Sequence, residues 1–175
     1  MTVPTTPPVD HGLTPEDFPG VNGLTQEAID SAVATIRRLA GWHVWPERED
    51  TVTVVSPGDP LVVLPTKHLA DVLSVTVDGE VVEVGEDDWT PDGTLWIGRL
   101  RPSRSGRPHR VTAQIRHGYA APGDVLGLVA SMAGRASLPA TSYGVGRINV
   151  GAPGTATPQS TEWRIIDQIK MGPLP

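Results

Sequence analysis

Apolar residues recur at helical spacing in two segments of the chain. Over residues 26–40 they fall on one face, with Thr25 placed as an N-cap and Gly41 as a stop. A second helix is predicted over residues 122–136, where Pro122 stands at the first position. The apolar stripe of this second helix comprises Val125, Leu128, Val129, Met132 and Ala136. The pattern therefore predicts two amphipathic helices that lie far apart in sequence.

Between these helices, over residues 51–118, the pattern changes to the alternation and β-branched runs that are typical of strands. The predicted strands are 51–55, 61–64, 72–77, 80–84, 95–97 and 110–117. Asp78-Gly79 separates two apolar runs and predicts a two-residue type I′ hairpin turn, and Asp92-Gly93 predicts a similar turn. The predicted fold class is α+β: a small helical core from two sequence-distant helices, with a β-rich insertion between them.

The two ends of the chain differ in composition from this middle part. Residues 1–23 hold five prolines, which predicts an extended arm without fixed structure in the free monomer. Residues 137–160 are rich in Pro, Gly, Ser and Thr and predict no regular element, whereas residues 162–171 predict a short amphipathic helix. The predicted organisation is an arm (1–23), a core (24–137) and a C-terminal docking tail (138–175).

Charge is divided unevenly along the chain, whose formal net charge is −6. Residues 47–92 carry most of the acids, and residues 93–118 carry arginines and no acid. A solvated acidic face with a basic loop explains this pattern as well as a subunit with one negative and one positive side, suited to docking on copies of itself. On the second interpretation Arg101, Arg104 and Arg107 are candidate contacts between subunits.

Little in the sequence points to catalysis. The chain has no cysteine, which excludes disulfides and thiol chemistry, and it carries no HExxH, P-loop, GxGxxG or GxSxG motif. His68 and Asp71 are near in sequence, but we expect neither a metal nor a general-base role for them. His43 and His117 are expected to be partly buried with ordinary hydrogen bonds. We predict no catalytic residue, cofactor or metal, and no apolar run is long enough to span a membrane.

Several motifs, taken in order, resemble one family. They are Ile36-Arg37-Arg38-Leu39-Ala40-Gly41-Trp42-His43-Val44, Leu64-Pro65-Thr66-Lys67-His68-Leu69, Asp71-Val72-Leu73-Ser74-Val75-Thr76-Val77-Asp78-Gly79, His117-Gly118-Tyr119, Ala121-Pro122-Gly123-Asp124-Val125 and Met132-Ala133-Gly134-Arg135-Ala136. Their arrangement over about residues 25–137 resembles the head-to-tail adaptor (head–tail connector) proteins of long-tailed phages that infect actinobacteria. The proline-rich first 20 residues and the Gly/Pro-rich tail depart from the family pattern.

The resemblance implies a structural virion protein of the phage neck, assembled in the host cytoplasm, and not an enzyme. It implies a homo-oligomeric ring, twelve-membered in the family, that binds the portal on one side and a stopper or tail protein on the other while DNA passes through without specific recognition. The alternatives are a stopper or tail-completion protein and a carbohydrate- or host-binding β module, with a metal-dependent hydrolase last.

Two further sets of residues are candidate contacts. Gly127 and Gly134 lie on a small-residue line of the second helix and predict the close approach of another backbone, from the first helix or a neighbouring subunit. The C-terminal helix is predicted to be ordered only in the assembled neck, since so short a helix is marginal alone. Its candidate contacts with the portal or a neighbouring subunit are Trp163, Ile165, Ile166 and Ile169.

Overall fold

The computed structural model describes residues 10–102, 106–137, 142–145, 148–151 and 157–172. It confirms the α+β fold class. The chain forms two compact units, one made of residues 1–39 and 122–168 and the other of residues 40–121 and 169–175. This division groups the C-terminal helix with the first helices, whereas the sequence analysis set a boundary after residue 137.

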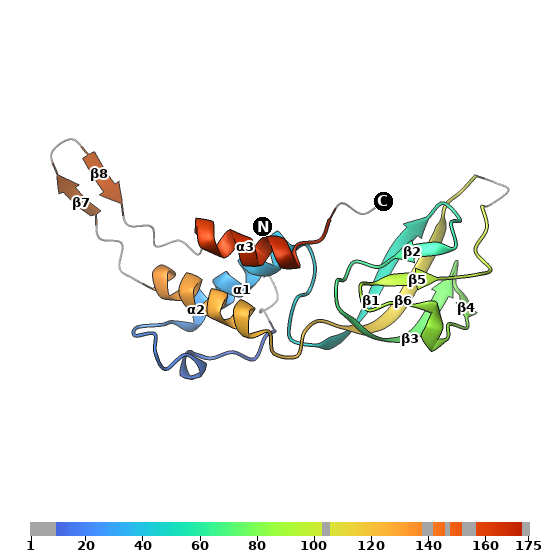
Figure 1. Ribbon diagram of the computed structural model, residues 1–175, viewed down its shortest axis with the longest axis horizontal. Coiled ribbons are helices and arrows are strands. Elements are labelled where there is room, and N and C mark those ends of the chain that lie inside the picture. Colours follow the sequence, from blue (N-terminus) through green and yellow to red (C-terminus); the bar gives the residue numbers. More distant parts are fainter. Residues whose placement is uncertain (1–9, 103–105, 138–141, 146–147, 152–156, 173–175) are drawn as a thin grey trace, which may run out of the picture. The chain divides into compact units, whose positions relative to one another are not determined.

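The first unit contains the helices α1 (Gln26–Ala40), α2 (Gly123–Ala136) and nearly all of α3 (Ser160–Ile169) (Figure 1). Helix α1 spans the predicted residues, and the hydroxyl of Thr25 accepts a hydrogen bond from the backbone N–H of Ala28 at 3.2 Å, as an N-cap does. The backbone N–H of Thr25 donates to the Ser137 hydroxyl, which joins the start of α1 to the end of α2. The buried side chains of α1 and α2 in this unit are Ala28, Ile29, Ala32, Val33, Ile36, Val125, Leu128, Val129, Met132 and Ala133.

The segment before α1 has more fixed structure than the sequence analysis expected. It contains the short 3-10 helix η1 (Pro15–Asp17). The ring of His11 is buried and lies 3.0 Å from the carboxylate of Asp30 on α1, and Arg37 donates to the carbonyl of Asp10. The prediction of an arm without fixed structure is therefore wrong for residues 10–23, because polar contacts with α1 hold them. Residues 1–9 lie outside the described residues.

The second unit is built on a four-stranded antiparallel sheet. Its strand order is β1-β6-β3-β4, with β1 (Arg48–Ser56), β6 (His109–His117), β3 (Leu69–Val77) and β4 (Glu80–Val82). A smaller sheet pairs β2 (Leu61–Val63) with β5 (Thr94–Trp96), and the short 3-10 helix η2 (Glu86–Asp88) follows β4.

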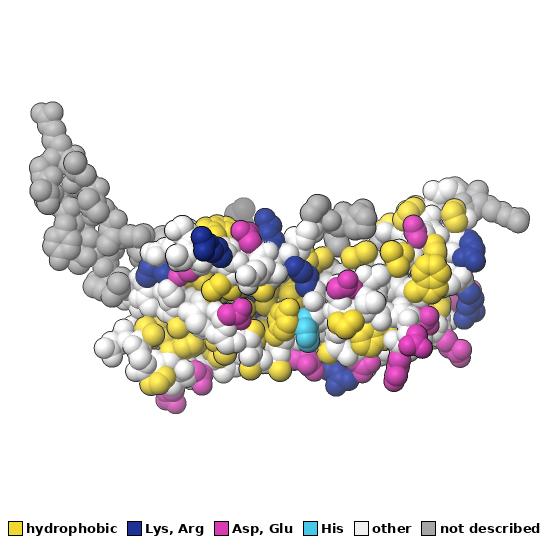
Figure 2. Space-filling view, viewed as in Figure 1, with side chains coloured by type: hydrophobic (Ala, Val, Ile, Leu, Met, Phe, Trp, Pro, Cys, Tyr) yellow, Lys and Arg dark blue, Asp and Glu magenta, His cyan; other side chains and the backbone are white. Residues whose placement is uncertain are grey.

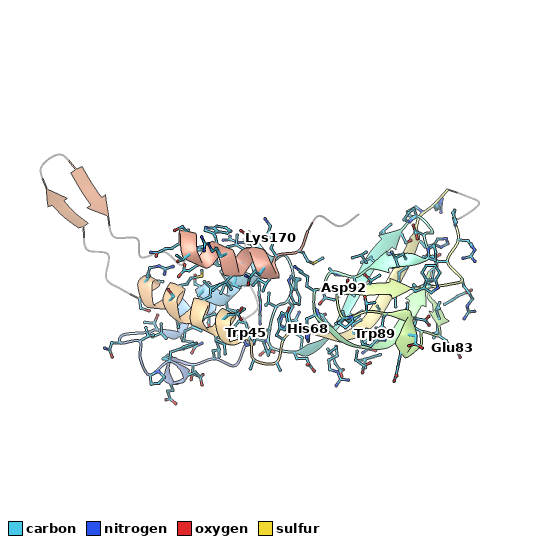
Figure 3. The ribbon with its side chains drawn as sticks, in the orientation of Figure 1. Trp45, His68, Glu83, Trp89, Asp92 and Lys170 are labelled. Carbon is cyan, nitrogen blue, oxygen red and sulfur yellow. The ribbon has the colours of Figure 1, made fainter. Side chains whose placement is uncertain are left out.

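The core of this unit is formed largely by side chains of these strands. Its buried members are Val62, Leu64, Leu69, Val75, Leu95, Ile97, Leu100, Val111, Ala113 and Ile115. Trp89 is partly buried and packs against them (Figure 3). The other face of the larger sheet carries polar side chains, among them Thr53 and Thr112, whose hydroxyls are 3.1 Å apart. Alternation along the strands thus produces one apolar and one polar face.

Of the two predicted turns, the one at Asp78-Gly79 forms as expected, whereas Asp92 lacks the positive φ that a type I′ turn at Asp92-Gly93 requires. Asp78 and Gly79 both have positive φ, 52° and 90°, as a type I′ turn between β3 and β4 requires. Gly93 also has positive φ, and a Cβ there would lie 2.5 Å from the carbonyl oxygen of Thr66, so the position needs glycine.

The segment between α2 and α3 differs from the prediction of no regular element. Strands β7 (Ser142–Val145) and β8 (Ile148–Gly151) pair antiparallel and form a separate two-stranded sheet (Figure 1). Glycines and serine interrupt any apolar alternation in these strands, so the sequence pattern gave no signal for them.

Candidate interaction surfaces

The C-terminal helix is anchored to α2 by a buried carboxylate. Glu162 is 8% exposed, and its Oε1 and Oε2 atoms each lie 2.7 Å from a guanidinium nitrogen of Arg135. Oε1 also accepts from the Ser131 hydroxyl, and Oε2 accepts from the backbone N–H of Gln159. Burial raises the pKa of Glu162, but these hydrogen bonds outweigh it and hold the pKa below its usual value.

The four candidate contacts on α3 have different environments. Ile166 is fully buried and Ile169 is 7% exposed, whereas Ile165 is half-buried and Trp163 is 37% exposed. The prediction of a helix that is ordered only in the assembled neck did not anticipate that α3 contributes Ile166 to the interior of the chain. Of the four, Trp163 has the most surface available to a partner, and its role as a contact stays a prediction.

The two candidate glycines on α2 have different surroundings. A Cβ on Gly134 would lie 3.0 Å from the Cγ1 of Val21, so the close approach predicted there comes from the segment before α1. A Cβ on Gly127 would meet nothing within 4 Å, so no described part of the chain explains this glycine. Contact between Gly127 and another subunit stays a prediction.

The acidic and basic stretches do not form two opposite sides of the second unit. Strand β6, from the basic stretch, lies between β1 and β3, which come from the acidic stretch. Arg116 on β6 accordingly lies 2.6 Å from the carboxylate of Asp71 on β3. The sheet order thus interleaves charges that the sequence separates.

Two arginines of the predicted basic loop, Arg101 and Arg107, lie in the segment between β5 and β6. Arg101 and Arg107 are exposed, and Arg104 lies outside the described residues. The Arg101 side chain donates to the carbonyls of Gly98 and Leu100, which fixes it against its own loop. A contact of these arginines with another subunit stays a prediction.

His109 ties this loop to the hairpin turn. Its Nδ1 lies 2.6 Å from Asp78 Oδ2, and its Nε2 lies 2.8 Å from the carbonyl oxygen of Arg101. Both partners are acceptors, so only the imidazolium form, which carries a proton on each nitrogen, satisfies both. The hydrogen bonds to Asp78 and Arg101 accordingly raise the pKa of His109.

His43, His68 and His117 have different polar partners, although the rings of His43 and His117 lie 5.5 Å apart. His68 Nδ1 lies 3.1 Å from the carbonyl oxygen of Gly118, whereas Asp71 is engaged by Arg116, so the two residues near in sequence have different partners. His43 lies 2.5 Å from the carbonyl oxygen of Pro46. His117 is 2% exposed, and its Nε2 lies 3.7 Å from the carboxylate of Asp50. Contrary to expectation, its ring nitrogens make no hydrogen bond among the described residues, and burial lowers its pKa.

A cluster of exposed apolar side chains lies on the second unit. Leu61 and Trp96 face each other across the β2–β5 pair and are each 49% exposed, and Val55 on β1 is 68% exposed. In Figure 2, apolar side chains are exposed over the part of the surface that β1 to β6 form, with Lys or Arg side chains beside them. Sequence reasoning missed this cluster, because the strand pattern did not show which apolar side chains of β1, β2 and β5 stay uncovered.

In the described part of the chain, His, Asp and Glu side chains nowhere gather in a group of three or more that could hold a metal ion. Among the helices that the structure describes, none combines the length and apolar character needed to cross a membrane.

Comparison with known proteins gives a likeness of fold. A solved structure of the neck of an empty GTA (gene transfer agent) particle, computed with C6 symmetry, contains a chain that superposes with a TM-score of 0.53. The match covers 85% of this chain and 78% of that chain, at 17% identity. The chain therefore shares the fold of a protein in that neck. No protein-family model and no curated protein matches the sequence.

Proposed function

We propose that the chain is a structural subunit of a virion neck, a head-to-tail adaptor that forms a ring between the portal and the stopper or tail and lets DNA pass. The observation that carries this proposal is the likeness of fold to a chain of a particle neck over 85% of the sequence. The motifs from Ile36 to Ala136, which resemble the adaptor family, support the same assignment independently.

The two-unit architecture suits such a role. A neck subunit must contact neighbours around the ring and different proteins above and below it, which requires several separate surfaces on one small chain. The exposed Trp163 of the helical unit and the exposed cluster of Val55, Leu61 and Trp96 on the β unit supply surfaces on both units. The role is structural and contains no catalytic step.

Deleting the gene in the phage that encodes the chain tests the proposal. Particles made without an adaptor should accumulate as DNA-filled heads and separate tails, and a plasmid copy of the gene should restore joined particles. Joined, infectious particles in the deletion strain would overturn the proposal. Tails that lose only host attachment would instead support a host-binding module.

A further inference from the structure

Strand β1 leaves one edge of the larger sheet open. It pairs with β6 on one side, and the sheet order places no described strand on the other. About half of the backbone N–H and C=O groups of such an edge strand point away from the sheet. These groups can accept the backbone of another strand.

The charges of β1 stand at its first three residues, Arg48, Glu49 and Asp50, and Asp50 lies on the same face as Val52. The centre of the strand leaves the edge unprotected. Natural edge strands carry lysine, proline, a bulge or an inward-pointing charge that discourages pairing. The centre of β1 is Thr51-Val52-Thr53-Val54-Val55, which has none of these and consists of β-branched residues that favour strands.

Burial along β1 shows that the apolar core is incomplete at the edge. Val52 and Val54 pack against the core but remain partly exposed. Their partners on β6, Ala113 and Val111, are fully buried. An added strand would cover Val52 and Val54 from the open side.

A hollow of about 400 Å³ lies beside the same edge, lined by residues 53–57 at the end of β1, by Asp59 and by residues 61–63 of β2. It includes the exposed side chains of Val55 and Leu61. The edge therefore offers both backbone groups and an apolar recess, the two features of recognition by strand addition.

The β7–β8 hairpin is a candidate donor of the added strand. It forms a sheet of its own, and an isolated two-stranded hairpin is at best marginally stable in water. The residues of its two strands, 142–145 and 148–151, carry no charge, so they meet the uncharged centre of β1 without repulsion between like charges.

We propose that the β7–β8 hairpin of one copy adds to the open β1 edge of the next copy and extends its sheet. The contact joins two different surfaces, so it repeats from copy to copy and can close a ring. The partner is a second copy because the proposed ring places copies of the chain next to one another. The inference rests on the proposed ring, but its test measures contact between copies, whereas the proposed function is tested by tail attachment.

Two variants separate the donor from the acceptor. Replacing residues 142–151 by a Gly/Ser segment of equal length removes the hairpin and keeps the edge. Val52→Lys keeps the hairpin and places a charge on the inner face of the edge, and Val52→Thr is its uncharged control of similar shape. Circular dichroism and thermal melting establish that each variant folds.

Mass photometry and sedimentation, up to the highest soluble concentration, give the result. We expect the wild type and Val52→Thr to associate, each of the other two variants to stay monomeric, and their equimolar mixture to form a one-to-one dimer and nothing larger. A wild type that stays monomeric, a hairpin-less variant that associates like the wild type, or a mixture without dimers would overturn the proposal.

Disulfide trapping tests the same contact if Val52→Lys fails to fold. The chain has no cysteine of its own, so a single introduced cysteine is the only one in its chain. A chain with Thr53→Cys is mixed with chains carrying one cysteine at Ser142, Gly144, Asn149 or Gly151, and Ser31→Cys on α1 is the control partner. A mixed disulfide with at least one hairpin position and none with Ser31→Cys supports the contact. Disulfides that form only between two Thr53→Cys chains would overturn the proposal in favour of pairing between two β1 strands. In a chain that carries Thr53→Cys and a hairpin cysteine together, a disulfide that forms only within the chain would overturn it in favour of pairing with the chain's own hairpin.

Discussion

The guanidinium of Arg135 on α2 donates two parallel hydrogen bonds, each 2.7 Å long, to the carboxylate of Glu162 on α3. This geometry is the strongest form of an ion pair between side chains, and both groups are largely shielded from water. It connects the C-terminal helix to the helix that precedes the β7–β8 hairpin. The pair therefore fixes the two ends of the segment that carries the hairpin.

Removing the carboxylate should destabilise the fold. Glu162→Ala leaves Arg135 without its partner, and we expect a loss of about 2 kcal/mol in the free energy of unfolding, since hydrogen bonds to charged groups contribute about that much. Asp167→Ala, an exposed acid on the same helix, is the control and should change little. Urea denaturation measures both, and equal effects would show that α3 is not anchored by Glu162.

The same pair gives a pH dependence of known sign. The pKa of Glu162 is lower in the folded chain than its usual value of 4.5, so its contribution to stability is fully present above that value. It is lost as the pH falls through the lower, folded pKa. The acid limb of the stability curve should therefore flatten in Glu162→Gln, and an unchanged acid limb would contradict the assignment.

Two residues of α3 should respond differently to truncation. Ile166→Ala creates a cavity in the interior and should cost about 2–5 kcal/mol of stability. Trp163→Ala removes a partly exposed side chain and should change stability much less, while weakening attachment to the portal or to a neighbouring subunit. Thermal melting and a head–tail joining assay measure the two effects, and normal joining by a folded Trp163→Ala protein would remove Trp163 from the contacts.

His109 should titrate above the usual pH of a histidine. Because its pKa is raised in the folded chain, its contribution to stability is present below the usual value of 6.5 and is lost as the pH rises through the folded pKa. Asp78→Asn removes the charged acceptor, so NMR should show the His109 pKa falling toward 6.5. An unchanged His109 pKa in Asp78→Asn would contradict the bridge.

The two glycines of α2 should tolerate leucine unequally. Gly134→Leu must displace Val21 and should cost about 1–3 kcal/mol, the usual range for overpacking. Gly127→Leu meets open space within the chain, so the folded monomer should accept it, and a loss of assembly alone would place Gly127 at a subunit contact. Thermal melting and mass photometry distinguish these outcomes, and equal destabilisation by both leucines would contradict the packing described for α2.

The elements that sequence predicted well are those governed by local patterns. Helix α1 and the Asp78-Gly79 turn follow from spacing, capping and backbone freedom, which neighbouring residues determine. The burial of Ile166 depends on contacts with residues that are distant in sequence, which a local pattern does not reveal. The amphipathic pattern of α3 therefore fitted a docking helix on the surface equally well. The charge pattern misled for a similar reason, because sheet order brings Arg116 beside Asp71.

A cryo-electron microscopy reconstruction of the intact particle tests the central claim most directly. The account predicts that the three-helix unit and the four-stranded sheet fit density that is repeated around a ring at the junction of head and tail. The axis of this ring should hold DNA or an open channel through which DNA passes. Density for the chain on tail fibres or the capsid surface, or particles that lack the chain altogether, would contradict it.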